Sequence, residues 1–195
     1  METTTDFFKL KHNNLKPKQG LVLISEPFSD DSFFRRSVIL LAEHNKEGTV
    51  GFILNKPIKY NLSNIFEEFG DFDGSVCFGG PVNNNIIYYL HTLGEIIPGS
   101  IKIKDDLYWG GSFDILQKMI FSGAVNKNQI RFFVGYSGWD EGQLNSEIKK
   151  DFWLVSDIKN KTIMNFDTEI WGKVVSKLPE KYKIWANFPQ VPGFN

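Results

Sequence analysis

Residues 35–57 read RRSVILLAEHNKEGTVGFILNKP, and this stretch decides the fold. Two apolar runs, residues 38–42 and 49–54, stand on either side of a polar connector at residues 43–48. Each run is short and rich in β-branched and aromatic residues, which is typical of strands bounded by turns. Neither run alternates apolar with polar residues, so both faces of each strand are expected to be covered. The stretch therefore predicts an antiparallel hairpin at the centre of a sheet.

The composition fits one globular domain. The chain has 195 residues, of which 42% are hydrophobic and 23% charged, and its 18 Phe and 5 Trp favour a bulky, sheet-rich core. The single cysteine, Cys77, rules out a disulfide framework and favours a reduced, cytoplasmic compartment. No apolar run approaches the roughly 20 residues of a membrane span, and the first residues lack a secretory pattern. We expect one domain over residues 1–195, with an N-terminal arm at 1–19 and an irregular tail at 186–195.

Outside the hairpin, clusters of strands are interrupted by single helices. This order favours an α+β domain with a mixed, mostly antiparallel sheet over a doubly wound parallel fold. The arm is expected to dock through Phe7 and Phe8. Strands are expected at 20–24, 75–78, 86–91, 101–103, 129–136, 153–155 and 162–164. Helices are expected at 62–69 and between Asp167 and Pro179, and two more are expected to begin at the caps Ser112 and Asp140.

Candidate nucleophiles lack the neighbours that catalysis requires. The predicted strand at 129–136 is expected to lead into a loop at 137–139. The segment 135–139, GYSGW, ends in Trp139 where a nucleophile elbow would have glycine, so Ser137 is not expected to react. Cys77 lies within a predicted strand, where a free cysteine usually packs as a small hydrophobic residue. We therefore expect no enzyme activity of a recognisable class.

Metal and anion motifs are equally weak. The three histidines, His12, His44 and His91, have no second ligand at metal-binding spacing, so we expect no metal and no cofactor. The segment 110–112, GGS, could hold an anion through free backbone N–H groups, but a turn followed by a helix cap is the favoured interpretation.

The charge balance disfavours direct binding to DNA. The net charge is −1 and the pI is about 6.3, whereas phosphate neutralisation supplies most non-specific affinity for nucleic acid. The basic clusters at 35–36, 149–150 and 181–183 have acidic neighbours and no helix–turn–helix spacing. We leave DNA open as a partner but expect a protein or a small molecule instead.

Polar groups at the ends of the predicted strands form the candidate binding site. Because an antiparallel hairpin brings its two open ends together, Arg36 and Asn55 should form one cluster and His44 at the turn another. We expect Tyr136, Trp139 and Gln143 to join one of these two clusters and favour the Arg36 cluster, where an arginine beside amide and indole donors would suit an anionic partner. Two alternatives stay open: these groups brace one another, or a carboxylate such as Asp114 or Glu147 pins Arg36.

Several separated motifs resemble one family. RSV at 36–38, EHN at 43–45 with Gly48, LN at 54–55 with Pro57, GGPV at 79–82 and GYSGWDEGQL at 135–144 follow the order of the YqgE/AlgH family, with mild departures such as Lys56 in place of a usual arginine. The resemblance implies an α+β fold whose curved sheet forms a pseudo-barrel with helices packed outside, in a cytosolic bacterial protein.

The family carries the label of a transcriptional regulator and supplies no catalytic residues. Two hypotheses follow for the function. The protein regulates gene expression through a protein partner or a ligand, or it is a small-molecule or protein-binding module with no role in transcription. We expect no membrane partner, and a monomer or a weak homo-oligomer.

Overall fold

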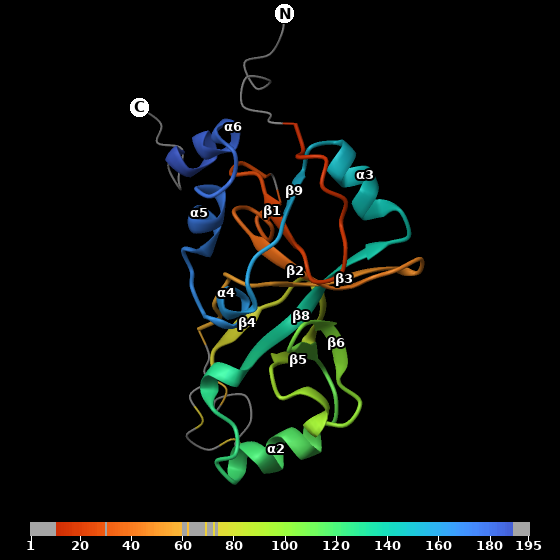
Figure 1. Cartoon of the computed structure of the whole chain (residues 1–195), viewed down its shortest axis with the longest axis vertical. Helices are drawn as coiled ribbons and strands as arrows, with labels where there is room; N and C mark the ends of the chain where they lie inside the picture. The colour runs from red at the N-terminus through yellow and green to blue at the C-terminus, as the bar shows by residue number, and fades with distance from the viewer. Residues whose placement is uncertain are drawn as a thin grey trace, which may run out of the picture.

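A nine-stranded sheet forms the centre of the molecule (Figure 1). The computed structural model describes residues 11–29, 31–59, 62, 69, 72 and 74–188. The strand order is β6-β7-β5-β8-β3-β2-β1-β9, with β4 beside β8. The strands are β1 Val22–Ser25, β2 Val38–His44, β3 Gly48–Ile53, β4 Val76–Phe78, β5 Val82–His91, β6 Ile101–Lys104, β7 Leu107–Trp109, β8 Ile130–Asp140 and β9 Trp153–Ser156.

The predicted central hairpin is confirmed. Strands β2 and β3 pair antiparallel, with Leu40 opposite Phe52, and the amide of Asn45 donates to the carbonyl of Gly48 to close the turn. The five residues from Val38 to Ala42 are all fully buried, as expected of a strand with both faces covered. Leu40 belongs to one hydrophobic core and Leu41 to another on the opposite face.

Strand β8 holds the two halves of the sheet together. One of its edges pairs with β5, and the other is shared between β3 and β4. Among the strands that the structure describes, β4 and β8 alone pair in parallel, which confirms a mixed, mostly antiparallel sheet. Gly135 (φ 67°) lets the strand pass close to the segment before β5, because a Cβ there would collide with the carbonyl oxygens of Gly80 and Val82. Strand β8 continues through Gly135 and Gly138 to Asp140, so the predicted loop at 137–139 is wrong.

The sheet is curved but not closed by hydrogen bonds between its end strands, β6 and β9, as far as the chain is described. Side chains bridge the gap instead. Lys104 Nζ lies 2.8 Å from Asp157 Oδ1 and 2.8 Å from the carbonyl oxygen of Ile158, so the end of β6 is tied to the segment after β9. The expected α+β class with a curved sheet is confirmed.

Helices cover the sheet on separate faces, as Figure 1 shows for α3 and α5 in its upper half and α2 at the lower end. Leu144 and Ile148 of α3 pack in one core with the strands of the hairpin. Full burial of such a side chain stabilises the fold by about 1.5–3 kcal/mol. The α-helices are α2 Phe113–Phe121, α3 Gln143–Lys149, α4 Asn160–Met164, α5 Ile170–Val175 and α6 Glu180–Lys183, and the 3-10 helices are η3 Gly94–Ile96, η4 Lys127–Gln129 and η5 Ile184–Asn187.

One predicted helix cap holds and two local predictions are wrong. Ser112 caps α2, and its hydroxyl accepts from the amide of Ile115. Asp140, in contrast, ends β8, and α3 begins after Gly142 in the left-handed region. The predicted strand at 162–164 is the helix α4, which leaves the carbonyl of Ile163 free to accept from the buried Arg131. A strand paired on both sides would have used that carbonyl in its ladder.

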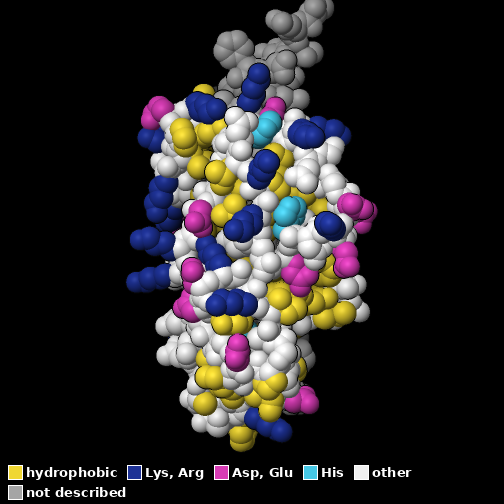
Figure 2. Space-filling view, turned by 45° about the vertical axis from the view of Figure 1, so that its right-hand side comes forward, with side chains coloured by type: hydrophobic (Ala, Val, Ile, Leu, Met, Phe, Trp, Pro, Cys, Tyr) yellow, Lys and Arg dark blue, Asp and Glu magenta, His cyan; other side chains and the backbone are white. Residues whose placement is uncertain are grey.

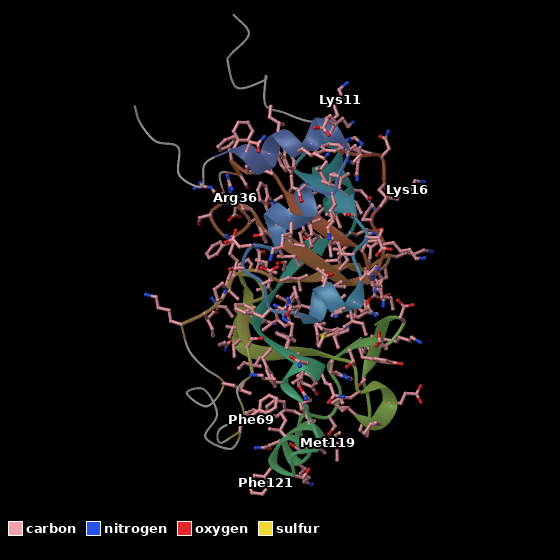
Figure 3. The ribbon with its side chains drawn as sticks, turned by 60° about the vertical axis from the view of Figure 1, so that its left-hand side comes forward. Lys11, Lys16, Arg36, Phe69, Met119 and Phe121 are labelled. Atoms are coloured by element: carbon pink, nitrogen blue, oxygen red, sulfur yellow. The ribbon has the colours of Figure 1, made fainter. Side chains whose placement is uncertain are left out.

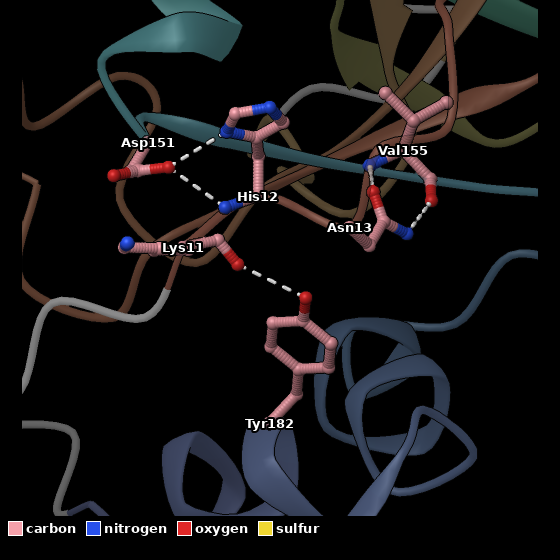
Figure 4. A network of polar contacts seen from close by, with 6 residues as sticks. All are labelled: Lys11, His12, Asn13, Asp151, Val155 and Tyr182. Atoms are coloured by element: carbon pink, nitrogen blue, oxygen red, sulfur yellow. Dashed lines mark hydrogen bonds and ion pairs between the residues drawn. The ribbon is translucent and has the colours of Figure 1, made fainter.

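The described part of the N-terminal arm packs against β9 and α6 (Figure 4). His12 bonds Asp151, Asn13 bonds the backbone of Val155 in both directions, and Tyr182 donates to the carbonyl of Lys11. Some predictions lie outside the described residues. These are the docking of Phe7 and Phe8, most of the helix at 62–69 and the tail beyond 188. No helix in the described ranges is both long and apolar enough to cross a membrane.

Candidate functional site

A pocket of about 530 Å³ opens at the end of the central hairpin that carries Arg36 and Asn55. Its other walls come from α5, through Trp171, and from the end of the described chain, through Phe188. Figure 3 shows Arg36 in the upper half of the molecule, well away from α2, whose Met119 and Phe121 are labelled at the lower end. We call this cavity the Arg36 pocket.

Asn55 fixes the backbone of Arg36. Its Nδ2 donates to the carbonyl oxygen of Arg36 at 2.8 Å, and its Oδ1 accepts from the amide of Val38 at 3.0 Å. Asn55 is 7% exposed, so the fold depends on both bonds being made. Arg36 itself has φ 52°, a left-handed conformation that non-glycine residues rarely adopt. The expected proximity of Arg36 and Asn55 is present, and Asn55 acts as the group that positions Arg36.

The guanidinium of Arg36 is held across the pocket. Its Nη2 donates to the carbonyl oxygen of Phe188 at 2.6 Å, and its Cζ lies 4.7 Å from the centroid of the Trp171 ring. A guanidinium stacked on an indole is attracted by the electrons of the ring. Its planar shape presents its N–H donors in an arrangement that suits a carboxylate or phosphate. The group is thus oriented before any ligand arrives.

Several positively charged side chains lie around this pocket. Burial lowers the pKa of Lys56, and the neighbouring charges of Arg35 and Arg36 lower it further. Lys56 Nζ donates to the carbonyl of Arg35 at 2.8 Å, which holds the ammonium group beside both arginines. Burial also lowers the pKa of Arg36, while the carboxylate of Glu169 raises it. An anion at this place would stabilise the charged forms of both side chains.

Exposed phenylalanines flank the charges. Phe28 is 40% exposed, and its ring centroid lies 4.9 Å from that of Phe188 in the pocket wall. Phe33 is 50% exposed and stacks at 5.3 Å on Phe78, whose amide donates to the carbonyl of Lys56. Neither ring is among the lining residues of the pocket, but Phe28 packs on its Phe188 wall and Phe33 packs on Phe78 next to Lys56.

His44 lies at the opposite end of the hairpin, as expected. Its Nδ1 is 2.7 Å from Thr49 Oγ1, the residue opposite it across the turn. Trp139 pairs with the same Thr49 from β8, and the amide of Asp140 donates to Gln143 Oε1. In the sheet, Trp139 and Gln143 therefore belong with the His44 end, and the expectation that they join Arg36 is wrong.

Glu147 ties the aromatic side chains of this region together. Its Oε2 accepts from the indole N–H of Trp139 at 2.9 Å and of Trp153 at 2.8 Å, and its Oε1 accepts from Gln143 at 2.9 Å. The carboxylate thus braces α3 against β8 and β9. Tyr136 joins neither cluster: it lies opposite Val82 and packs edge-on against Tyr88.

The candidate nucleophiles occupy structural positions. Ser137 is fully buried, and its hydroxyl donates to the carbonyl of Gly79 at 3.0 Å. Cys77 is also fully buried, and burial raises the pKa of its thiol, although Arg131 Nη2 lies 3.2 Å from the sulfur and opposes the shift. Among the residues whose positions are described, no group of His, Cys, Asp or Glu side chains could hold a metal ion.

Of the nine described residues that line the Arg36 pocket, the sequence predicts only Arg36 and Asn55 as site residues. Trp171 falls within a predicted helix and Phe188 within the predicted irregular tail. Both lie more than a hundred residues from Arg36 along the chain, and the hydrogen bond between Arg36 and Phe188 spans 152 positions. No periodicity or spacing signals such a contact. Lys56 could have been found, because it follows Asn55 at the predicted open end.

The comparisons with known proteins agree in family and in fold. A family model described as AlgH-like matches residues 22–183. A UPF0301 protein of Bacteroides fragilis is 45% identical over the full length of both chains, and one of Chlorobium limicola is 37% identical over 92% of this chain and 97% of its own.

Two solved structures are similar in fold. A crystal structure of a protein from Corynebacterium diphtheriae has a TM-score of 0.70 at 21% identity and covers 96% of this chain and 100% of its own. The solution structure of the AlgH protein from Pseudomonas aeruginosa has a TM-score of 0.67 at 24% identity and covers 83% and 91%. The family match and the identity of the relatives establish that this chain belongs to the AlgH-like family.

Proposed function

We propose that this protein is a non-catalytic binding module that receives an acidic segment of a partner protein in the Arg36 pocket. The observation that carries the proposal is the oriented guanidinium of Arg36 beside Lys56, with exposed phenylalanines close by. Arginine and aromatic side chains are the groups that most often dominate the energy of protein interfaces.

The charge of the pocket supports an acidic ligand group. Arg35 and Arg36 lie close enough to Lys56 to lower its pKa, and the carboxylate of Glu169 raises the pKa of Arg36. A carboxylate entering the pocket would form charge-assisted hydrogen bonds, which are about twice as strong as neutral ones. The alternative that Asp114 or Glu147 pins Arg36 receives no support, because Glu147 is bonded to Trp139 and Trp153 and Asp114 lies on α2.

The exposed aromatic rings favour a protein segment over an inorganic anion. Phe28 and Phe33 would pack against apolar side chains on either side of the bound carboxylate, and such burial contributes roughly 25 cal/mol per Å². A regulatory effect on gene expression in the cytoplasm would, on this proposal, be exerted through the bound protein. Direct contact with DNA is disfavoured by the net charge of −1.

The test is a fluorescence anisotropy titration with a panel of labelled peptides in which a glutamate stands between leucine or phenylalanine residues. We expect at least one peptide to bind wild-type protein, and its affinity to fall with added salt because the pocket charges are partly exposed. Arg36→Gln should weaken this binding about tenfold or more, the effect of losing roughly 1.4 kcal/mol.

The matched control is Lys150→Gln, which also removes one positive charge but lies at the exposed end of α3. It should leave binding unchanged, and both variants should retain the circular dichroism spectrum of the wild type. Failure of every peptide to bind, or an equal loss in the two variants, would overturn the proposal. A duplex DNA oligonucleotide serves as the competing ligand, and tight salt-sensitive binding to it would favour direct regulation instead.

A further inference from the structure

A second and larger cavity lies where the two ends of the curved sheet meet. It measures about 1070 Å³ and is bounded by the end of β9, by α4 and by α5. Lys104 bridges the sheet ends here through Asp157, and Asn160 Nδ2 donates to Asp106 Oδ1 at 2.6 Å. We call it the seam groove. Its volume is at the upper end of the range of about 300–1,000 Å³ that is usual for small-molecule sites.

The acidic side chains of the seam groove are already engaged. Asp106 accepts from Asn160, Asp157 from Lys104, and Asp167 from Lys173 at 2.7 Å. The bond from Lys173 is the main reason that the pKa of Asp167 is lowered, so this carboxylate is held in its charged form. Asp157 and Asp167 are therefore each paired with a lysine, whereas Asp106 keeps its charge because its partner Asn160 is a neutral amide.

Three lysines of the same groove have no such partner. Lys159, Lys161 and Lys177 line it, and within the described ranges none of them forms an ion pair or a side-chain hydrogen bond. Figure 2 shows Lys and Arg side chains gathered down one edge of the upper part of the molecule. The net charge presented by the groove is therefore positive.

A buried cation lies close to the residues that line the groove. Arg131 is 1% exposed and donates to the carbonyl of Ile163, to the carbonyl of Leu54 at 2.7 Å and to the sulfur of Cys77. In the part of the chain that is described, no carboxylate pairs with it, although buried charges are normally paired. Ile163 stands between Thr162 and Met164, both of which line the groove. The uncompensated charge of Arg131 thus adds to the positive field of the three lysines.

The side chain of Asn160 contains a hydrogen-bond acceptor that no described donor satisfies. Its Oδ1 is buried and has no partner among the described residues. The assignment of its two amide atoms is fixed, because only the NH₂ group can donate to the carboxylate of Asp106. A buried acceptor left unsatisfied costs about 1–3 kcal/mol, which a hydroxyl group of a ligand would recover.

We propose that the seam groove binds a small organic anion that also carries hydroxyl groups, such as a sugar phosphate or a hydroxy acid. The phosphate or carboxylate lies among Lys159, Lys161 and Lys177, near the charge of Arg131, and a hydroxyl donates to Asn160. The site shares no residue with the Arg36 pocket, so it is independent of the function proposed above.

Isothermal titration calorimetry tests this inference with a panel of hexose phosphates, glycerol phosphate and citrate, with inorganic phosphate and glucose as comparisons. We expect at least one hydroxylated anion to bind at least about tenfold more tightly than inorganic phosphate, because Asn160 recognises the hydroxyl. Glucose, which lacks the charge, should not bind. Equal binding of inorganic phosphate, or no binding by any member of the panel, would overturn the proposal.

Charge-matched variants locate the site. The double variant Lys159→Gln with Lys161→Gln should weaken binding about tenfold or more, whereas Lys149→Gln with Lys150→Gln at the end of α3 should not. Arg36→Gln should leave this binding unchanged. Equal weakening by both double variants would contradict the assignment. Weakening by Arg36→Gln alone would move the anion to the other pocket and refute the seam groove without refuting the proposed function.

Discussion

Asn55 holds Arg36 in its left-handed conformation from across the central hairpin, through a hydrogen bond of 2.8 Å to the Arg36 carbonyl. The same side chain accepts from the amide of Val38 at 3.0 Å, so it joins the end of β3 to the start of β2. The orientation of the Arg36 side chain over Trp171 depends on this backbone geometry. The position of Arg36 in the candidate pocket is therefore fixed by the same hydrogen bonds that join β2 to β3.

Replacing Asn55 should destabilise the protein. Asn55→Ala leaves the buried amide of Val38 without an acceptor and the carbonyl of Arg36 without its donor, which costs about 1–3 kcal/mol. The free energy of unfolding in urea measures the loss. Asn145→Ala, at an exposed position of α3, is the control and should change it by less than about 0.5 kcal/mol. A change of similar size in the two variants would contradict the role of Asn55.

Glu147 should stabilise the fold through the two indole groups. Glu147→Ala removes the acceptor of Trp139 and Trp153 together and should lower the free energy of unfolding by about 2–4 kcal/mol, since hydrogen bonds to charged groups contribute about 1.5–3 kcal/mol each. Glu147→Gln keeps an acceptor oxygen and should lose less. Equal stability of Glu147→Ala and the wild type in urea would show that the shared carboxylate is dispensable.

The fold and the site differ in how much of them the sequence could predict. The hairpin of β2 and β3 was predictable because its apolar runs are short, β-branched and separated by a polar turn. Ser112 was predictable as a cap because capping depends on a local side chain. Both features rest on interactions between residues that are near in sequence.

The errors have a common physical cause, which is contact between distant residues. Residues 162–164 favour a strand by propensity but form α4, whose free carbonyl at Ile163 receives Arg131. Residues 137–139 suggested a loop but continue β8 to Asp140, and Gly135 allows the close approach of Gly80. The wall of the Arg36 pocket formed by Trp171 and Phe188 likewise depends on long-range packing.

Acid should release the N-terminal arm through Asp151. Burial raises the pKa of this carboxyl, but the bonds from the amide and ring of His12 outweigh it, so the pKa is lower than its ordinary value of 3.8. A carboxyl whose pKa is lowered by folding stabilises the protein above the unfolded pKa, and this contribution is lost as the pH falls through the folded pKa. Asp151→Asn should thus be less stable than the wild type at neutral pH, and the difference should shrink below a pH of about 4.

Asparagine suits this comparison because it tolerates the positive φ of 66° at position 151. The measurement is a series of urea unfolding curves for the two proteins across the acidic range. A stability difference that does not depend on pH would show that the ionised carboxylate is not what holds the arm.

Lys56 should report on the charge of the Arg36 pocket. Because burial and then the charges of Arg35 and Arg36 lower its pKa, Arg36→Gln should raise that pKa towards the ordinary lysine value of 10.5. Nuclear magnetic resonance of the ¹³C-methylated amine can follow the titration. An unchanged Lys56 pKa in Arg36→Gln would mean that the two charges do not interact across the pocket.

The most direct test of the proposed function is a crystal structure of the protein with the tightest peptide of the acidic panel. We predict a glutamate carboxylate of the peptide within about 3 Å of a guanidinium nitrogen of Arg36, with Lys56 Nζ beside it. Apolar side chains of the peptide should cover Phe28 or Phe33. A peptide bound elsewhere on the molecule, or bound with its carboxylate pointing away from Arg36, would contradict the account.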